Sequence, residues 1–318
     1  MEVRKVNGFF IIFVIGYIGL SVVCASIMAY AQNSGIAVPD WIQYVMSEGI
    51  ILLIAIIYMI VQKIDPIREI PYKRIGIVDV ILSLVAGYCL IPAVLLISNL
   101  SMLFSTNYLE EGTTTLLTYP FAMQVILLAV IPPLVEELIF RGIFFGSYRK
   151  AGMTGAALMS GLLFGCFHLN INQALYAFVM GIVFAYMVEA TGSLWSSVIA
   201  HFAVNTYSIG IVQILKMAGI YAQDGSVSET FENAESVAGQ STAVTVVQIV
   251  MIAVIAAVFM MLAVLCIRTM AKRHGNLEKM KIQKVKLSHI KNYFTAPVIV
   301  GIVVCVMYMI MLEFSGTL

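Results

Sequence analysis

IPPLVEELIFRGIFFG, residues 131–146, places Glu136, Glu137 and Arg141 inside an otherwise apolar segment. Each charge at the centre of a membrane-spanning helix costs about 2.5–3.5 kcal/mol on the insertion scale, so three that face lipid would cost roughly 7–10 kcal/mol. These side chains must therefore face protein or a wet cavity, where they are paired or neutralised. The segment predicts a helix that packs inside a bundle of membrane helices.

The spacing within this segment separates the two glutamates. Glu137 and Arg141 are four residues apart, so on a helix they share a face and are predicted to form an ion pair. Glu136 is rotated by about 100° from Glu137 and points elsewhere, where its carboxylate can serve as a base. An inert ion pair that only fixes helix packing explains Glu137 and Arg141 but leaves Glu136 unexplained. Pro132 and Pro133 can kink the helix and free backbone groups toward a cavity.

The composition of the whole chain agrees with a membrane protein. Of 318 residues, 61% are hydrophobic and 11% are charged, whereas soluble proteins have about 25% charged residues. The mean hydropathy is +0.98. A net charge of +1 gives no global basic signal, so no nucleic-acid partner is expected. The five cysteines lie in apolar stretches without metal-ligand spacing and are interpreted as small core residues.

Apolar spans fill most of the chain. Spans of the roughly 20 residues that cross a bilayer lie near 9–31, 42–62, 76–104, 121–148, 242–267 and 294–314. Three shorter spans, near 154–170, 172–189 and 193–215, predict a buried inner bundle. The first span is longer than the roughly 7–15 apolar residues of a signal peptide, so it is interpreted as a retained helix. The predicted fold class is all-α, a polytopic transmembrane helical bundle of about eight or nine helices.

The charges outside the core predict the orientation. With the N-terminus in the cytoplasm, sixteen of the 18 lysines and arginines fall on the inner side, as the positive-inside rule requires. The predicted outer loops carry acids, namely Glu110, Glu111, Asp224, Glu229, Glu232 and Glu235. We expect a multi-pass protein of the cell membrane with N-terminal helices (1–115), a core (116–215) and C-terminal helices (216–318) that include a basic cytoplasmic loop (268–292). This loop is interpreted as an orientation signal on anionic lipid, with a regulatory or nucleic-acid-binding segment as the alternative.

Two other spans of the core carry polar side chains. Phe164 and His168 share a face of the span 154–170, and His201 and Asn205 share a face of the span 193–215. At 1.5 Å per residue, Glu136 and His168 lie about 20 Å from the inner ends of their helices, and His201 and Asn205 about 12–18 Å. These overlapping depths predict that the four polar residues meet in one site.

Small residues predict how the core helices pack. Gly142 and Gly146 form one GxxxG pattern, and Gly161 and Gly165 form another. Such faces let two helices approach closely. We expect them to bring the helices 121–148 and 154–170 together.

The predicted site fits the hydrolysis of a peptide bond, which needs an activated water and donors for the developing oxyanion. Glu136 can take the proton of the water, with His168 sharing in positioning and proton transfer. His201 and Asn205 can donate hydrogen bonds to the oxyanion. Glu136, His168 and His201 also match a zinc-ligand set, but HExxH spacing is absent, so a metal would be held across helices.

Three motifs carry a family resemblance. EELIFR (136–141), FGCFH (164–168) and HFAVN (201–205) resemble the EExxxR, FxxxH and HxxxN motifs of the CAAX prenyl protease type II family, also called the CPBP or Abi family. The resemblance covers about 120–210. It implies an intramembrane endopeptidase in which Glu136 and His168 activate water and His201 and Asn205 stabilise the transition state.

The resemblance also implies supporting residues, a cofactor range and substrates. Glu137, Arg141 and Phe164 would support the site. Members have been described both as metalloproteases and as metal-independent glutamate proteases, so the cofactor is either none or one divalent metal such as zinc. Relatives trim prenylated CAAX proteins or serve in bacteriocin maturation, self-immunity or peptide signalling. The expected partner is therefore a membrane-associated peptide or protein within the lipid bilayer.

Two other functions are open. A proton-coupled transporter could use Glu136, His168 and His201 as a relay, but it predicts paired broken helices in two repeated halves, and the sequence shows no such symmetry. A catalytically silent membrane scaffold or immunity protein is the second alternative, and the intact motifs argue against it.

Overall fold

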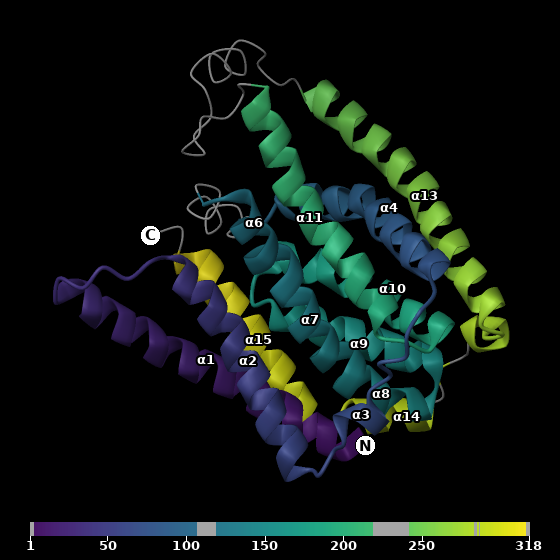
Figure 1. The fold of residues 1–318 in the computed structure, drawn as a ribbon, viewed down its shortest axis with the longest axis horizontal. Coiled ribbons are helices and arrows are strands. Elements are labelled where there is room, and N and C mark those ends of the chain that lie inside the picture. The colour runs from purple at the N-terminus through teal and green to yellow at the C-terminus, as the bar shows by residue number, and fades with distance from the viewer. Residues whose placement is uncertain (1–2, 107–118, 219–241, 283–284, 286, 316–318) are drawn as a thin grey trace.

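The computed structural model describes residues 3–106, 119–218, 242–282, 285 and 287–315, and in these ranges all regular structure is helical (Figure 1). Eight helices are long and apolar enough to cross a membrane, and Met153–Phe167 is a shorter apolar helix. The predicted all-α bundle of eight or nine helices is confirmed. The acids of the predicted outer loops, Glu110, Glu111, Asp224, Glu229, Glu232 and Glu235, lie outside the described residues. The cytoplasmic N-terminus and the division near 115 and 215 stay predictions.

The first helices are α1 (Val3–Asn33), α2 (Trp41–Val61), α3 (Pro66–Glu69) and α4 (Ile77–Ser101). A continuous helical run follows, made of α6 (Phe121–Gln124), η2 (Val125–Val130), α7 (Ile131–Glu137), η3 (Leu138–Phe145), α8 (Gly146–Tyr148) and η4 (Arg149–Ala151). The remaining elements are α9 (Met153–Phe167), α10 (Ile171–Thr191), α11 (Trp195–Met217), α13 (Thr242–Arg273), η5 (Leu277–Met280), α14 (Leu287–Tyr293) and α15 (Ala296–Ser315).

The helices form a central group with a flank on each side (Figure 1). In the centre, α9 and α10 pack along each other. On one side, α4 packs against α13, α11 and α10. On the other side, α1 packs against α15 and α2, and α2 contacts α7. The run from α6 to α8 therefore lies between the two flanks.

The expectation of an inner bundle is confirmed for α9 and α10, which bury most of their residues. Leu169 turns the chain between them with a positive φ of 54°, and the side chain of Asn170 caps α10 by accepting the backbone N–H of Gln173 at 3.1 Å. A Cβ on Gly161 would lie 2.7 Å from the carbonyl oxygen of Phe178. The small face of α9 thus lets α10 approach. The helix 121–148 does pack against α9, through η3 and α8. The prediction that Gly161 and Gly165 mediate this contact was wrong, because α10 packs against them.

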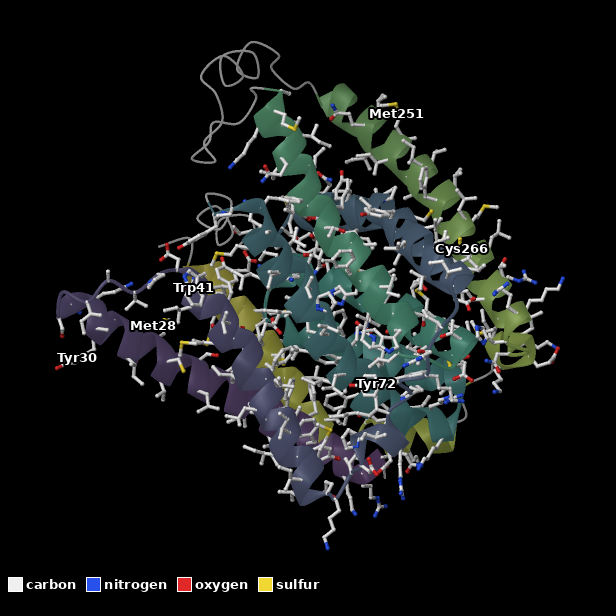
Figure 2. The ribbon with its side chains drawn as sticks, viewed as in Figure 1. Met28, Tyr30, Trp41, Tyr72, Met251 and Cys266 are labelled. Carbon is white, nitrogen blue, oxygen red and sulfur yellow. The ribbon has the colours of Figure 1, made fainter. Side chains whose placement is uncertain are left out.

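The outer helices present apolar side chains away from the bundle (Figure 2). Tyr30 near the end of α1 is 77% exposed, and Met251 on α13 is 54% exposed. Such surfaces are expected where a helix meets lipid rather than water. This surface supports the interpretation of the long apolar helices as membrane spans.

The run from Phe121 to Ala151 departs from a regular α-helix at two π-helical segments, η2 and η3. The backbone N–H of Ile131 donates to the carbonyl of Ile126, five residues back. Pro132 and Pro133 have no N–H, so the carbonyl of Leu128 has neither of the donors that an α-helical or π-helical ladder would give it. The prolines thus free a backbone acceptor, as the sequence predicts, next to the segment that carries both glutamates.

Candidate active site

The predicted ion pair between Glu137 and Arg141 forms. Arg141 Nη1 donates to Glu137 Oε1 at 2.8 Å, and both side chains are fully buried. The guanidinium lies 4.2 Å from the ring centroid of Phe164 and 5.2 Å from that of Phe184. Its Nε and Nη2 have no hydrogen-bond partner, so the two ring faces provide the remaining stabilisation of its charge. The ion pair packs tightly between α9 and α10. A Cβ on Gly181 of α10 would lie only 3.2 Å from Arg141 Nη2.

His201 of α11 hydrogen-bonds to the same carboxylate, that of Glu137. Its Nδ1 lies 3.1 Å from Glu137 Oε1, which also accepts from Arg141. A carboxylate bound to arginine is ionised and accepts, so His201 Nδ1 carries the hydrogen. The other ring nitrogen, Nε2, faces Glu136 Oε2 at 3.8 Å. Glu137 therefore fixes the orientation of His201 toward Glu136.

Glu136 differs from its neighbour in almost every respect. Its side chain is 14% exposed, and its contact with His201 is longer than a hydrogen bond. The side chain makes no shorter ion pair within the part of the chain that the structure describes. Two consecutive glutamates thus have opposite environments, because the helix turns about 100° between them.

His168 caps the C-terminal end of α9. Its Nδ1 lies 2.7 Å from the backbone carbonyl oxygen of Phe164. Because a carbonyl only accepts, Nδ1 carries the hydrogen and Nε2 of the neutral ring has a free lone pair. The ring of Phe164 lies edge-on to His168 at 4.6 Å and to His201 at 5.8 Å between centroids. Phe164 thus packs against Arg141 and both histidines.

Asn205 lies one turn beyond His201 on α11 and donates a hydrogen bond to a different acceptor. Its Nδ2 donates to the carbonyl of Leu128 at 2.9 Å. This is the carbonyl that Pro132 and Pro133 leave without a backbone donor. One N–H of the Asn205 amide is therefore bound to the broken helix, and the other is left for a further acceptor.

The possible metal ligands do not form a metal centre in this arrangement. In the described ranges, no three side chains of His, Cys, Asp or Glu are placed so that they could hold one ion. Nδ1 of His168 and Nδ1 of His201 are both bound to protein acceptors, which leaves Nε2 of each ring as the nitrogen that could coordinate. Glu136, His168 and His201 are nevertheless not placed to hold one zinc ion as they stand.

Two residues near the site were missed by the sequence analysis. Glu48 of α2 has a buried Oε2 without a hydrogen-bond partner, and α2 packs against α7, which carries Glu136. The signal was present, because Glu48 is an acid inside the apolar span 42–62, where a charge is expensive. Phe184 of α10 stacks on Arg141 and lies 5.3 Å from the His201 ring. No sequence pattern distinguishes it from an ordinary core phenylalanine.

Comparisons with known proteins match the segment that contains this site. Residues 118–207 match the family model of the type II CAAX prenyl endopeptidase Rce1-like proteins. A protein of Bacillus subtilis (strain 168) named "Putative membrane peptidase YdiL" is 33% identical over 88 residues, which cover 27% of this chain and 36% of that protein. The chain thus matches about a third of the length of this relative. No solved structure matches. The predicted family resemblance is confirmed: the segment that carries Glu136, His168, His201 and Asn205 is similar to the type II CAAX prenyl endopeptidase (CPBP) family.

Proposed function

We propose that this chain is an intramembrane endopeptidase that hydrolyses peptide bonds in membrane-associated peptides or proteins. The family of its core segment and the name of its relative support a membrane peptidase. The observation that carries the proposal is the contrast between two adjacent glutamates. Glu137 is bound by Arg141 and His201, whereas Glu136 faces His201 and keeps its carboxylate available.

In the proposed mechanism Glu136 takes a proton from the attacking water. His168 assists through Nε2, which has a lone pair because Nδ1 donates to the carbonyl of Phe164. A base held in a protein site contributes about 10²–10⁴-fold to the rate. The low exposure of Glu136 limits competing hydration of its carboxylate.

The oxyanion would be stabilised by His201 and Asn205. The proton that Glu136 takes from the water would pass to His201 Nε2, which faces Glu136 Oε2. Both ring nitrogens of His201 then donate, and the Glu137 carboxylate at Nδ1 stabilises the imidazolium. The second N–H of the Asn205 amide supplies a further donor. Arg141 and Phe164 act as supports, since they fix the carboxylate and the rings on which His201 depends.

No metal is used in this mechanism, because the donor set does not fit one. Of the two alternatives for this family, a metalloprotease and a metal-independent glutamate protease, we therefore propose the glutamate protease. A chelator should leave the rate unchanged when it is added to purified protein, and a loss of activity that zinc restores would contradict the metal-free mechanism.

The substrate lies within or at the membrane in this proposal. Prenylated CAAX proteins and the precursors of bacteriocins or signalling peptides are the two substrate classes that the family resemblance implies. A cytoplasmic N-terminus, predicted from the distribution of lysine and arginine, would give the enzyme its orientation.

The test compares peptides released from membranes that hold the wild type or Glu136→Gln at matched expression. A product seen only with the wild type would establish proteolysis and define the scissile bond. Glu136→Gln protein that inserts normally and still releases the product would rule out Glu136 as the base. No difference in any peptide would favour the transporter or scaffold, and proton flux in vesicles would then distinguish those two.

A further inference from the structure

The turn that carries His168 is short and strained. His168, Leu169 and Asn170 are the three residues between the end of α9 and the start of α10. Leu169 has a φ of 54°, in the left-handed region that favours glycine. Such a conformation is costly for leucine and persists only where surrounding contacts hold it. The turn therefore depends on contacts from outside itself.

The backbone of α9 holds its own last residues only loosely. The N–H of His168 donates to the carbonyl of Gly165 at 3.2 Å, and the N–H of Leu169 donates to that of Cys166 at 3.3 Å. Both bonds are longer than the usual distance of about 2.9–3.0 Å, and both span three residues rather than the four of an α-helix. The hydrogen bond of the His168 ring to the carbonyl of Phe164 also lies within α9. The place of His168 relative to other helices is therefore set by what holds the turn.

Asn172, two residues after the turn, links the start of α10 to α4. It is 1% exposed. Its Nδ2 donates to Ser101 Oγ at 2.8 Å, to the carbonyl of Ser98 at 3.0 Å and to Ser98 Oγ at 3.1 Å. Its Oδ1 accepts from Ser98 Oγ at 3.2 Å. A buried amide that is bound through both its nitrogen and its oxygen fixes the start of α10 on α4.

The same helix α4 also holds the helix of His201. A Cβ on Gly87 of α4 would collide with the carbonyl oxygen of Ala200 and would lie 2.8 Å from the Cβ of Ala203. The backbones of α4 and α11 are thus in close contact at residues on either side of His201. Since α4 packs along both α10 and α11, one helix fixes the elements that carry the two histidines.

We propose that Asn172 is a positioning residue, which holds the turn after α9 on α4 and so sets the place of His168 relative to His201. This proposal rests on the function proposed above, in which His168 assists the attack of water. A displacement of about 1 Å at a reacting group can cost about 100-fold in rate. α4 lies outside residues 118–207, the segment that matches the family model. A helix outside the family segment thus takes part in building the site.

The test is a double-mutant cycle between Asn172 and His168. The wild type, Asn172→Leu, His168→Ala and the double variant are purified in detergent, and their rates are normalised to the folded monomer. The probe is a quenched-fluorescent peptide that spans the scissile bond found by the peptide-release comparison. Asn99→Leu is the matched control, because Asn99 is exposed on α4 and its Nδ2 donates to the carbonyl of Leu95 in the same helix.

Asn172→Leu keeps the size of the side chain and leaves the carbonyl of Ser98 with other donors. This carbonyl still accepts the N–H of Met102 at 3.0 Å and the hydroxyl of Ser101 at 2.8 Å. Ser101→Ala is a milder second variant, because it removes one acceptor of Asn172 and leaves those of Ser98. Its cycle with His168→Ala decides the question if Asn172→Leu gives no folded monomer.

Asn172→Leu should lower kcat by about 10- to 100-fold and leave KM within about twofold, because a displaced His168 slows the chemical step without removing a substrate contact. Ser101→Ala should lower kcat by about two- to tenfold, and Asn99→Leu should leave it unchanged. In the His168→Ala background, Asn172→Leu and Ser101→Ala should each lower the residual rate by no more than about twofold, because the group that they position is absent.

Two results would overturn the role of Asn172. One is a wild-type kcat in folded Asn172→Leu and Ser101→Ala protein. The other is losses that multiply in the double variants, which would make Asn172 a structural residue that acts independently of His168. A wild type that cleaves no peptide would instead contradict the proposed function. The failure of one proposal is thus distinguishable from the failure of the other.

Discussion

Two clusters in this protein combine the same three residue types, a carboxylate, an arginine and a histidine. In the core, Glu137 Oε1 accepts from Arg141 Nη1 at 2.8 Å and from His201 Nδ1 at 3.1 Å. The side chains of Glu137 and Arg141 are fully buried and that of His201 is 5% exposed. The arginine reaches the carboxylate from the next turn of the same helical run, and the histidine comes from α11.

The second cluster joins α4 to the end of α13. Asp79 Oδ1 accepts from Arg273 Nε at 3.1 Å, and Asp79 Oδ2 lies 3.0 Å from His274 Nε2. Asp79 is buried, but the side chains of Arg273 and His274 are 44% and 31% exposed. The distances are thus nearly those of the core cluster, whereas the exposure differs greatly.

This difference shows that a carboxylate in contact with an arginine and a histidine does not by itself form an active site. The core cluster lies beside Glu136 and next to the freed carbonyl of Leu128, so it positions groups that remain available for chemistry. The Asp79 cluster has no such neighbour in the described residues and joins two helices. Its exposed partners lose part of their electrostatic energy to solvent screening.

The largest expected difference between the clusters is in activity. Glu136→Gln should lower the hydrolysis rate of the purified protein by about 10²–10⁴-fold, because it removes the base. Asp79→Asn should stay within about twofold, since no charge of its cluster reaches the reacting atoms. Hydrolysis of a quenched-fluorescent peptide that spans the scissile bond found by the peptide-release comparison, normalised to folded protein, measures both. Equal losses in the two variants would contradict the distinction between the clusters.

The next difference is in stability. Arg141→Met leaves the carboxylate of Glu137 buried without its cation and should cost about 3–5 kcal/mol. Arg273→Met removes a half-exposed partner and should cost about 0–1 kcal/mol. The fraction of monomer that survives heating in detergent reports both changes. Normal stability of Arg141→Met combined with lost activity would instead place Arg141 among the groups that contact substrate.

A smaller effect is expected at the broken helix. Asn205→Leu leaves the carbonyl of Leu128 without a donor and should cost about 1–3 kcal/mol in stability, in addition to any loss of rate. Ser208→Ala, at an exposed position one turn further on α11, is the control. The same heating assay measures both variants. Unchanged stability of Asn205→Leu would show that the carbonyl finds another donor, and would leave Asn205 free to serve the oxyanion alone.

The smallest effect is expected at the exposed histidine. His274→Gln keeps an N–H for Asp79 and should change stability by no more than about 1 kcal/mol. The change should shrink further in 1 M salt, where charges are screened beyond about 3 Å. A loss larger than that of Asn205→Leu would mean that the Asp79 cluster is as important to the fold as the core cluster.

Much of the candidate site could be predicted from local spacing. The interval of four residues predicts the Glu137–Arg141 pair, and the rotation between neighbours predicts that Glu136 points elsewhere, because both follow from helix geometry alone. The partner of Asn205 was not predictable in the same way. It depends on which face of α11 meets η2, and a single helix does not contain that information.

The helices that pack against the small residues could not be predicted from local spacing either. Gly161 and Gly165 predict a close contact, but the spacing does not say with which helix, and α10 rather than the helix 121–148 fills it. Glu48 was identifiable as an expensive charge, yet its relation to Glu136 needed the packing of α2 against α7.

The sequence by itself determined that this is a polytopic helical membrane protein, because apolar length and charge placement act through the bilayer without reference to other segments. It also determined which polar residues must be buried, because each would be too costly in lipid. Only the tertiary structure decided which of them meet. It placed His201 between two glutamates and Asn205 on the carbonyl that two prolines free, since these contacts join residues far apart in the chain and depend on how the helices pack.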